Sequence, residues 1–508
     1  MIMSDFLRDE DLCSTLQKEI IPLIDVRDFE GMYKVGGRPP VSPRILLMVT
    51  VFQFLEGLSD RAAAFNLRYR IDWKIALGLE LDDKGIHYSL LSRFRDRLLD
   101  DEQASYAFDK VLEYLTAIGL VKKGSKQRID STHVIGQVRE LSRLELLHET
   151  IRLFCIDAKP FRDRMDQLLV EDLEKYFGKV SIYRLTGEEK DQMIKNAGLA
   201  MRSFIAWAEQ TDSAIVLRTA KSYDTMKTVF TQNFEDKGPD DTPPKLIKIA
   251  TGRDHICSPH ESEARYANKG GKGWLGYKAQ IAETVSEPGS SDGSNFITFA
   301  EVAEATDHDG GIIEEYYSDQ AKHNIEPSEV YADTHYNTES NIESLATEGI
   351  NLKGPVVPMP KQDRTKSENR GFIADVANAK VTCPVGNESN RFSHRAQNKI
   401  SATFAKNDCQ DCNQKQLCKP APRGKNILIK LESKTLTDRR QDMTTLEFRR
   451  DMYKRNGIEG TLSGLVRGQR MRHSRYRGKS KLQFQVKCSA ASANIKRLHN
   501  YRQNADAA

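Results

Sequence analysis

Three carboxylates stand at positions where a protein could hold divalent metal ions. Asp130 lies inside an apolar strand pattern, Asp333 follows a second strand-like run, and Glu459 lies on a late helix. Carboxylate oxygens are the ligands that hard cations such as Mg²⁺ or Mn²⁺ prefer. Two such ions about 4 Å apart can activate water or a DNA 3′-hydroxyl and stabilise the departing 3′-oxygen during in-line attack at phosphorus.

Each of these acids also has a purely structural interpretation. A lone aspartate in a strand is commonly an edge or turn residue, and Asp333 could instead cap the helix that follows it. Glu459 lies in a stripe with Arg455 and Arg467 at helical spacing, which could be a surface ladder contributing about 0.2–0.5 kcal/mol per pair. The surrounding sequence must therefore decide between a metal site and a structural role.

The N-terminal residues, 1–121, are predicted to form an all-helical DNA-binding domain. Two runs with helical periodicity, 44–58 and 60–68, each follow a capping serine and resemble a helix-turn-helix element. A third helix is expected from Ser89 onward. Its apolar stripe leaves a basic face, either for DNA or for solvent, formed by Arg93, Arg95 and Arg97.

The fold class expected for the remainder is α/β, with a mixed-sheet catalytic domain in two parts, 122–357 and 425–502. The first part should contain a helical excursion at 138–210, strands at 127–134, 274–285, 295–305, 329–332 and 350–357, and a helix at 310–322. That alternation of strands and helices is typical of a mixed sheet. The second part should contain a helix at 437–465, a basic stretch, and a final helix at 482–498.

Residues 358–424 are predicted to be an inserted cysteine-rich module. Half of the eight cysteines fall within it, and a Cys-x2-Cys pair with two further thiolates suits a closed tetrahedral zinc site: Cys383, Cys409, Cys412 and Cys418. Unligated reduced cysteines and an iron-sulfur cluster are the alternatives, and His394 is a possible replacement ligand. Zinc held by four thiolates has no open position and would stabilise the module without taking part in chemistry.

Positive charge is concentrated at the C-terminal end. Residues 434–508 contain 18 Lys and Arg against 6 Asp and Glu, although the whole chain carries a formal net charge of only +4. This suggests a polyanionic partner, and we expect double-stranded DNA. The alternative is a solvated basic tail. With the three arginines of the N-terminal domain, the predicted DNA contacts are Arg455, Arg467, Arg470, Arg472, Arg475, Arg477, Lys479 and Lys481.

The N-terminus lacks the basic and apolar regions of a secretory signal, and the longest apolar-rich run, 45–55, is too short to span a bilayer. We expect a cytoplasmic protein that does not bind membranes.

A resemblance to a known family follows from eight short segments in order. They are similar to segments of DDE-type insertion-sequence transposases with an InsH-type N-terminal domain: Leu67–Lys74, His87–Arg95, Arg128–Thr132, Gly273–Lys278, Tyr331–Asn337, Arg455–Ser463, Arg472–Lys479 and Ala490–Leu498. The resemblance implies an RNase H-like catalytic fold with a DDE triad of Asp130, Asp333 and Glu459. It also implies catalytic Mg²⁺ or Mn²⁺, a homo-oligomer in the synaptic complex, and association with the nucleoid.

The glutamate helix departs from one branch of that family. The branch carries a Tyr-x2-Arg-x3-Glu-x6-Lys signature, but Met452 and Val466 occupy the tyrosine and lysine places here. Neighbouring Tyr453 and Arg467 are candidate substitutes for the DNA contacts of those two positions.

The leading functional hypothesis is a transposase that binds the terminal inverted repeats of its element, exposes 3′-hydroxyls and joins them to target DNA. An RNase H-like nuclease or resolvase would give cleavage without joined products. A catalytically inert DNA-binding regulator would keep its function after all three carboxylates are replaced.

Overall fold

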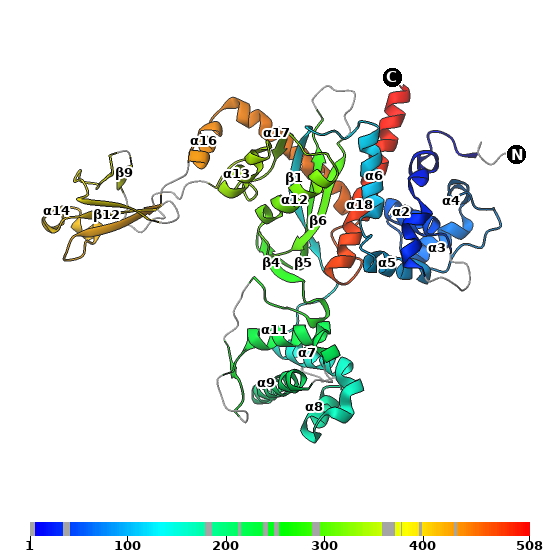
Figure 1. The fold of residues 1–508 in the computed structure, drawn as a ribbon, viewed down its shortest axis with the longest axis horizontal. Coiled ribbons are helices and arrows are strands. Elements are labelled where there is room, and N and C mark those ends of the chain that lie inside the picture. The colour runs from blue at the N-terminus through cyan, green and yellow to red at the C-terminus, as the bar shows by residue number, and fades with distance from the viewer. Residues whose placement is uncertain are drawn as a thin grey trace. The chain divides into compact units, whose positions relative to one another are not determined.

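The computed structural model describes residues 6–33, 41–177, 185–211, 215–236, 242–247, 253–286, 295–357, 371–376, 378–395, 399–430 and 434–507. The chain divides into two units (Figure 1). Unit 1 comprises Met1–Pro327 with Gly457–Ala508, and unit 2 comprises Ser328–Asn456. No described helix is long and apolar enough to cross a membrane.

Unit 1 begins with a helical domain, as the sequence predicts. Ser59 caps its third helix by accepting the Ala62 N–H at 3.2 Å, and Gly57 ends the second helix in the left-handed region at φ +68°. The helices are α1 (Leu12–Thr15), α2 (Pro43–Glu56), α3 (Asp60–Tyr69), α4 (Ile71–Ala76), α5 (Ser89–Asp100) and α6 (Tyr106–Ala117), with short 3-10 and π turns between Leu16 and Met32.

The last helix of the chain, α18 (Lys479–Ala507), packs against both α2 and α6. It also packs against β6 of the sheet described next, so it joins the N-terminal helices to the sheet (Figure 1). Buried side chains of these elements, among them Leu482, Val486 and Ile495, form one continuous core. Burial on this scale is the main source of stability in a soluble domain.

The sheet of unit 1 is antiparallel and is built around the long strand β5 (Lys272–Thr284). β5 pairs with β1 (Lys126–Ile135) on one side, and with β4 (Arg265–Lys269) and β6 (Ile297–Glu304) on the other. The register places Asp130 opposite Ile281 and Arg128 opposite Glu283. The strands expected at 127–134, 274–285 and 295–305 are confirmed, while β4 was not expected. Helix α12 (Ile313–Lys322) follows β6.

A helical excursion follows β1 and has its own core, formed by residues such as Phe154, Met201 and Met226. Two of its helices begin with capping boxes, in which Ser142 pairs with Glu145 and Thr186 with Glu189. Its helices are α7 (Arg143–Ala158), α8 (Gln167–Phe177), α9 (Gly187–Gln210), α10 (Ile215–Arg218) and α11 (Lys221–Asn233), so helix continues beyond residue 210; two short strands follow, β2 (Phe234–Glu235) and β3 (Lys245–Leu246).

Unit 2 begins with parallel strands β7 (Glu329–Tyr331) and β8 (Asn351–Lys353), joined by α13 (Glu339–Thr347). The helix expected at 437–465 is instead two helices, α16 (Lys434–Asp442) and α17 (Leu446–Gly468). The break falls at Thr445, whose hydroxyl accepts the Phe448 N–H at 3.1 Å. Threonine at this position starts a new helix rather than continuing the old one.

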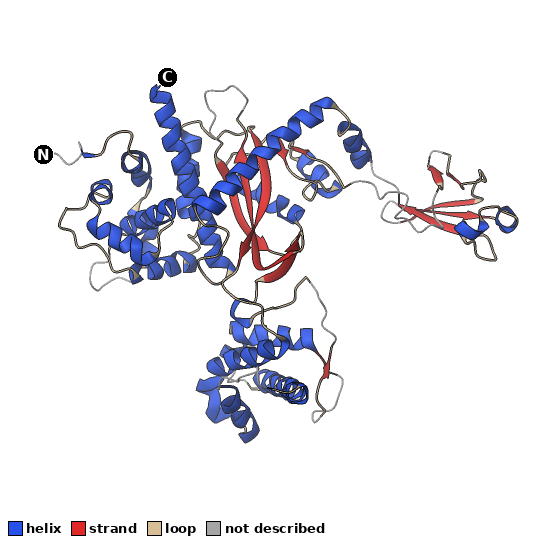
Figure 2. Cartoon of the chain, turned by 180° about the vertical axis from the view of Figure 1, so that it is seen from behind, coloured by secondary structure: helices blue, strands red, loops and turns tan. Residues whose placement is uncertain are grey.

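The cysteine-rich segment of unit 2 folds as a small strand-rich body (Figure 2). A three-stranded antiparallel sheet and a two-stranded ribbon enclose a core that includes Val381, Ile400 and Phe404. The elements are β9 (Ile373–Asp375), β10 (Lys380–Thr382), β11 (Arg391–Arg395), β12 (Lys399–Phe404), α14 (Lys406–Gln410), α15 (Lys415–Cys418) and β13 (Lys425–Lys430).

Candidate active site

Asp130 lies near the middle of β1 and is half-buried, between the fully buried Ile129 and the half-buried Ser131. One carboxylate oxygen accepts the N–H of Ser131 at 2.7 Å. The strand therefore holds Asp130 at the boundary between core and solvent, where its carboxylate can reach a cation.

Glu459 lies on α17 and is exposed. The predicted apolar stripe is confirmed, since Ile458, Leu462 and Leu465 are buried in the core of unit 1. Thr461 is also buried, at 8% exposure. Glu459 flanks this packed face, so its direction depends on how α17 is held against the sheet.

The strand of Asp130 and the helix of Glu459 are brought together in unit 1. The guanidinium of Arg128, two residues before Asp130, lies 2.0 Å from the position that a Cβ on Gly457 would occupy. Gly457 is two residues before Glu459. β1 and α17 therefore approach each other closely at positions two residues before Asp130 and two residues before Glu459.

A buried ion cluster marks this approach, and no sequence pattern had indicated it. Glu283 of β5 is fully buried and pairs with Arg128 at 2.6 Å and with Arg497 of α18 at 2.9 Å. The Thr461 hydroxyl donates to the same carboxylate at 2.6 Å. These four residues are far apart in the sequence, so only the fold could reveal the cluster.

Asp333 belongs to unit 2 and follows β7. Its side chain is 32% exposed, one oxygen accepts the His335 N–H at 2.8 Å, and the His335 ring lies 3.6 Å from the other. Asn337 donates to the Asp333 carbonyl at 2.8 Å. Buried Arg439 donates to the Gly354 and Leu352 carbonyls at 3.1 and 2.7 Å. These contacts fix the turn that carries Asp333.

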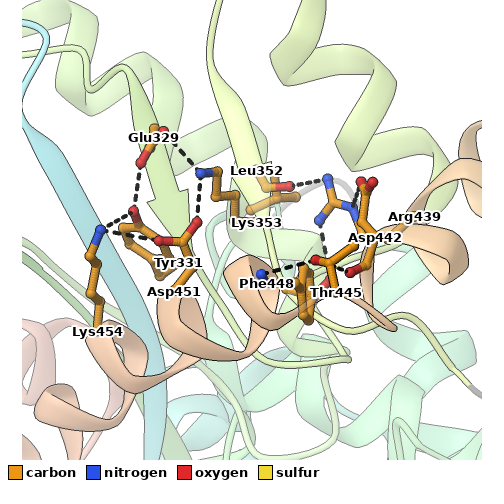
Figure 3. A network of polar contacts seen from close by, with 11 residues as sticks. Glu329, Tyr331, Leu352, Lys353, Arg439, Asp442, Thr445, Phe448, Asp451 and Lys454 are labelled. Carbon is orange, nitrogen blue, oxygen red and sulfur yellow. Dashed lines mark hydrogen bonds and ion pairs between the residues drawn. The ribbon is translucent and has the colours of Figure 1, made fainter.

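A second polar network in unit 2 ties the first half of α17 to β7 and β8 (Figure 3). Lys353 bridges Asp451 at 2.8 Å and Glu329 at 3.0 Å. Lys454 bonds Asp451 at 3.1 Å and the hydroxyl of Tyr331 at 3.4 Å. Tyr331 lies two residues before Asp333, so this network contacts the strand that carries Asp333.

His133 lies on β1 beyond Asp130, and its ring packs 4.9 Å from that of Trp274. Burial lowers the pKa of His133, and the charges of Arg472 and Lys269 lower it further. His133 and Asp130 are three residues apart on β1, so their side chains point to opposite faces of the strand.

The predicted basic residues divide into exposed and packed groups. Arg93 and Arg97 are exposed, but Arg95 is 5% exposed, pairs with Asp60 at 2.9 Å and lies 4.0 Å from the centre of the Tyr476 ring. The expectation that Arg95 shares an exposed basic face was wrong. The helix turns this arginine inward because Asp60 and Tyr476 satisfy its charge there.

The basic stretch after α17 divides in the same way. Arg472 donates to the His133 carbonyl at 2.7 Å, Arg475 donates to the Leu58 carbonyl at 2.9 Å, and Lys481 pairs with Asp96 at 2.8 Å. Lys479 is half-buried and Arg455, in unit 2, is half-buried too. The fully exposed members of the stretch are Arg467, Arg470 and Arg477.

The four clustered cysteines line one small cavity of about 30 Å³ beside Phe372 and Phe404: Cys383, Cys409, Cys412 and Cys418. Burial raises the pKa of Cys409 and of Cys418, and the neighbouring thiols contribute. In the described part of the chain, no three His, Cys, Asp or Glu side chains are gathered tightly enough to hold a metal ion. His394 does not line this cavity.

Comparison with known families places transposase domains at both ends of the chain. Residues 3–97 match a transposase domain (DUF772), and residues 382–499 match a transposase DDE domain. Together the two matches support a DDE insertion-sequence transposase and confirm the resemblance seen in the sequence. No curated protein and no solved structure matched the chain.

The mixed α/β architecture is consistent with an RNase H-like DDE domain. Such a domain implies a metal-dependent nuclease or transferase that acts on DNA, generally with a divalent ion such as Mg²⁺. The DDE match includes Glu459, the cysteine cluster and the basic stretch, whereas Asp130 and Asp333 lie outside it.

Proposed function

We propose that the protein binds the terminal inverted repeats of an insertion sequence, cleaves DNA at their ends and transfers the 3′ ends to target DNA as a homo-oligomer. The observation that carries the proposal is the contact between β1 and α17. It brings the strand of Asp130 against the helix of Glu459, the one proposed catalytic residue that lies within the matched DDE domain.

The donor set fits hard divalent cations. Asp130, Asp333 and Glu459 each present a carboxylate that is at least partly open to solvent. These residues would hold Mg²⁺ or Mn²⁺, which when bound lowers the pKa of a water or 3′-hydroxyl and neutralises charge on the phosphate.

Replacing the carboxylates tests the assignment. Glu459→Gln, Asp130→Asn and Asp333→Asn should each lower cleavage of end-bearing DNA by at least about 100-fold, because even outer contacts to a metal contribute 10–100-fold. Binding to the same DNA should be nearly unchanged. Glu447→Gln, an exposed glutamate on the same helix, is the matched control. Cleavage near the wild-type rate by Glu459→Gln would refute its role.

The products distinguish the competing functions. Strand transfer predicts joined products when target DNA and Mg²⁺ are supplied, whereas a nuclease or resolvase yields only cleaved ends. A regulator predicts that the triple carboxylate variant retains full function.

We also propose that Cys383, Cys409, Cys412 and Cys418 bind one structural zinc ion. The support is their common cavity and the preference of Zn²⁺ for thiolates. Binding would draw the four sulfurs to about 2.3 Å from the ion. Elemental analysis should find about one zinc per chain, which Cys409→Ser with Cys412→Ser should remove, while His394→Gln should retain it. A zinc-free wild-type preparation whose segment 380–420 resists protease would refute this proposal.

A further inference from the structure

Glu283 is an unusual buried charge, because it joins three separate elements in the core of unit 1. Its side chain is 0% exposed. One oxygen takes hydrogen bonds from Arg128 of β1, with the Nε at 2.8 Å. The other accepts from Thr461 of α17 at 2.6 Å and from Arg497 of α18 at 2.9 Å. Arg497 also donates to the Thr461 hydroxyl at 2.5 Å, which closes the cluster.

Stability alone does not account for such a cluster. Removing charges from water costs several kcal/mol per ion, and well-packed apolar side chains of similar volume often stabilise a core at least as well. A carboxylate that accepts directed hydrogen bonds from three different elements does something that apolar side chains cannot do. It fixes the separation and the rotation of the elements that donate to it.

Gly457 shows how closely α17 is held at this point. A Cβ there would meet the Arg128 Nη1 at 2.0 Å and its Cζ at 2.4 Å, well inside contact distance. A Cβ added at Gly460 or Gly464 of the same helix would meet nothing within 4 Å. Glycine in a helix costs about 0.5–1 kcal/mol relative to alanine. At Gly457 the absence of a side chain makes room for the Arg128 guanidinium, which accounts for this cost.

The cluster includes a residue two positions from each proposed catalytic residue of unit 1: Arg128 before Asp130 and Thr461 after Glu459. Arg128 and Asp130 are two apart on β1 and so share one face of the strand. Gly457 and Thr461 are four apart and so share one face of α17, while Glu459 lies between them, about 160° around the helix from Thr461. Fixing the Gly457–Thr461 face therefore fixes the direction in which Glu459 points.

We propose that Glu283 is a positioning residue for metal binding, which holds α17 in the rotation that directs Glu459 toward the ion shared with Asp130. Arg128, Thr461 and Arg497 act through it. The inference rests on the proposed function, since it concerns the same metal site, and it adds a residue that touches neither DNA nor metal.

Paired helix variants provide the sharpest test, with cleavage followed as a function of Mg²⁺ concentration. Gly457→Ala should displace Arg128, lower cleavage by about 10–100-fold and raise the Mg²⁺ concentration for half-maximal cleavage. Gly460→Ala should behave as wild type, because its Cβ meets open space. Both substitutions raise helix propensity equally, so propensity cannot explain a difference between them.

The hydroxyl of Thr461 allows a second comparison. Thr461→Val keeps the volume but removes the donor to Glu283, and should behave as Gly457→Ala does, whereas Thr461→Ser should restore the wild-type Mg²⁺ dependence. Glu283→Gln should show the largest rise in the Mg²⁺ concentration for half-maximal cleavage, provided that the variant folds. If it does not fold, the Gly457 and Thr461 variants test the positioning role. DNA binding and melting temperature are measured alongside.

The outcomes separate the two proposals. Gly457→Ala and Thr461→Val with the wild-type Mg²⁺ dependence would overturn the positioning role and leave the triad intact. A wild-type rate from Glu459→Gln would instead overturn the metal site itself. A lower rate with unchanged half-maximal Mg²⁺ would also count against positioning, because it would indicate a general loss of folded enzyme.

Discussion

The exposed arginines that follow the glutamate helix provide the most quantitative prediction. Arg467, Arg470 and Arg477 are exposed, whereas Arg472 and Arg475 donate to backbone carbonyls within unit 1. Each arginine that neutralises a DNA phosphate adds about 0.9 to the slope of log binding constant against log salt. If this stretch binds DNA as we propose, the phosphate contacts should come from the three exposed side chains.

Replacing the three exposed arginines with alanine should lower the salt slope by about 2.7. Between about 50 and 200 mM salt, a fourfold change, wild-type binding should then fall by a further factor of about 40 relative to the variant. Fluorescence anisotropy with labelled duplexes measures both slopes. The loss should be similar for end-bearing and unrelated DNA, because backbone contacts carry no sequence information.

Arg475→Ala is the matched control. Its guanidinium lies 4.7 Å from the centre of the Phe54 ring and donates to the Leu58 carbonyl, and burial lowers the pKa of Arg475. Removing it should lower the stability by about 1 kcal/mol, because the half-buried Leu58 carbonyl loses its hydrogen bond. The salt slope should stay unchanged. An unchanged slope in the triple variant, or a lower slope in Arg475→Ala, would show that the wrong arginines have been assigned to DNA.

Two further predictions concern folding. Gly276→Ala places a Cβ 2.1 Å from the Val134 carbonyl oxygen, so this substitution should sharply lower the melting temperature. Gly311→Ala is the control, because its Cβ meets open space and should leave the melting temperature unchanged. Equal melting temperatures of the two variants would contradict the close contact between the strands. Hydrogen bonding to Arg139 lowers the pKa of Glu145 from 4.5 to about 2, so the ionised carboxylate stabilises the fold above pH 4.5 and loses this effect as pH falls toward 2. The difference in denaturation midpoint between wild type and Glu145→Gln should therefore be present at neutral pH and vanish near pH 2.

Capping residues and hydrophobic periodicity predicted the helices and strands well where both features were present in the sequence. Helices α2 and α3 begin directly after Ser42 and Ser59, which the sequence marks as caps, and β1 extends only one residue beyond each end of the strand expected at 127–134. Helix periodicity failed at Thr445, because the apolar spacing continues through a residue whose hydroxyl caps a new helix. β4 was missed because Arg265–Lys269 has no apolar alternation, and it forms by pairing with β5.

The charged core residues could not have been found by local patterns. An arginine among helical residues predicts an exposed face, yet Arg95 is buried because Asp60 and Tyr476 lie around it in the fold. Glu283 is likewise a buried charge whose partners lie far away in the sequence, on β1, α17 and α18. The residue types of the proposed triad were visible in the sequence, but the contacts of the Glu283 cluster depend on long-range packing.

Helix α17 crosses the boundary between the two units in the sequence, and it has polar contacts in each of them. Its first half belongs to unit 2, where Asp451 and Lys454 contact the β7 and β8 strands. Its second half belongs to unit 1, where Gly457 and Thr461 meet the Glu283 cluster. Each set of contacts includes a residue two positions before a proposed catalytic aspartate. Glu459 lies three residues beyond Asn456, the last residue of unit 2. Such contacts matter most for the metal role that we propose for Glu459, because a carboxylate misdirected by about 1 Å would no longer complete the coordination of an ion.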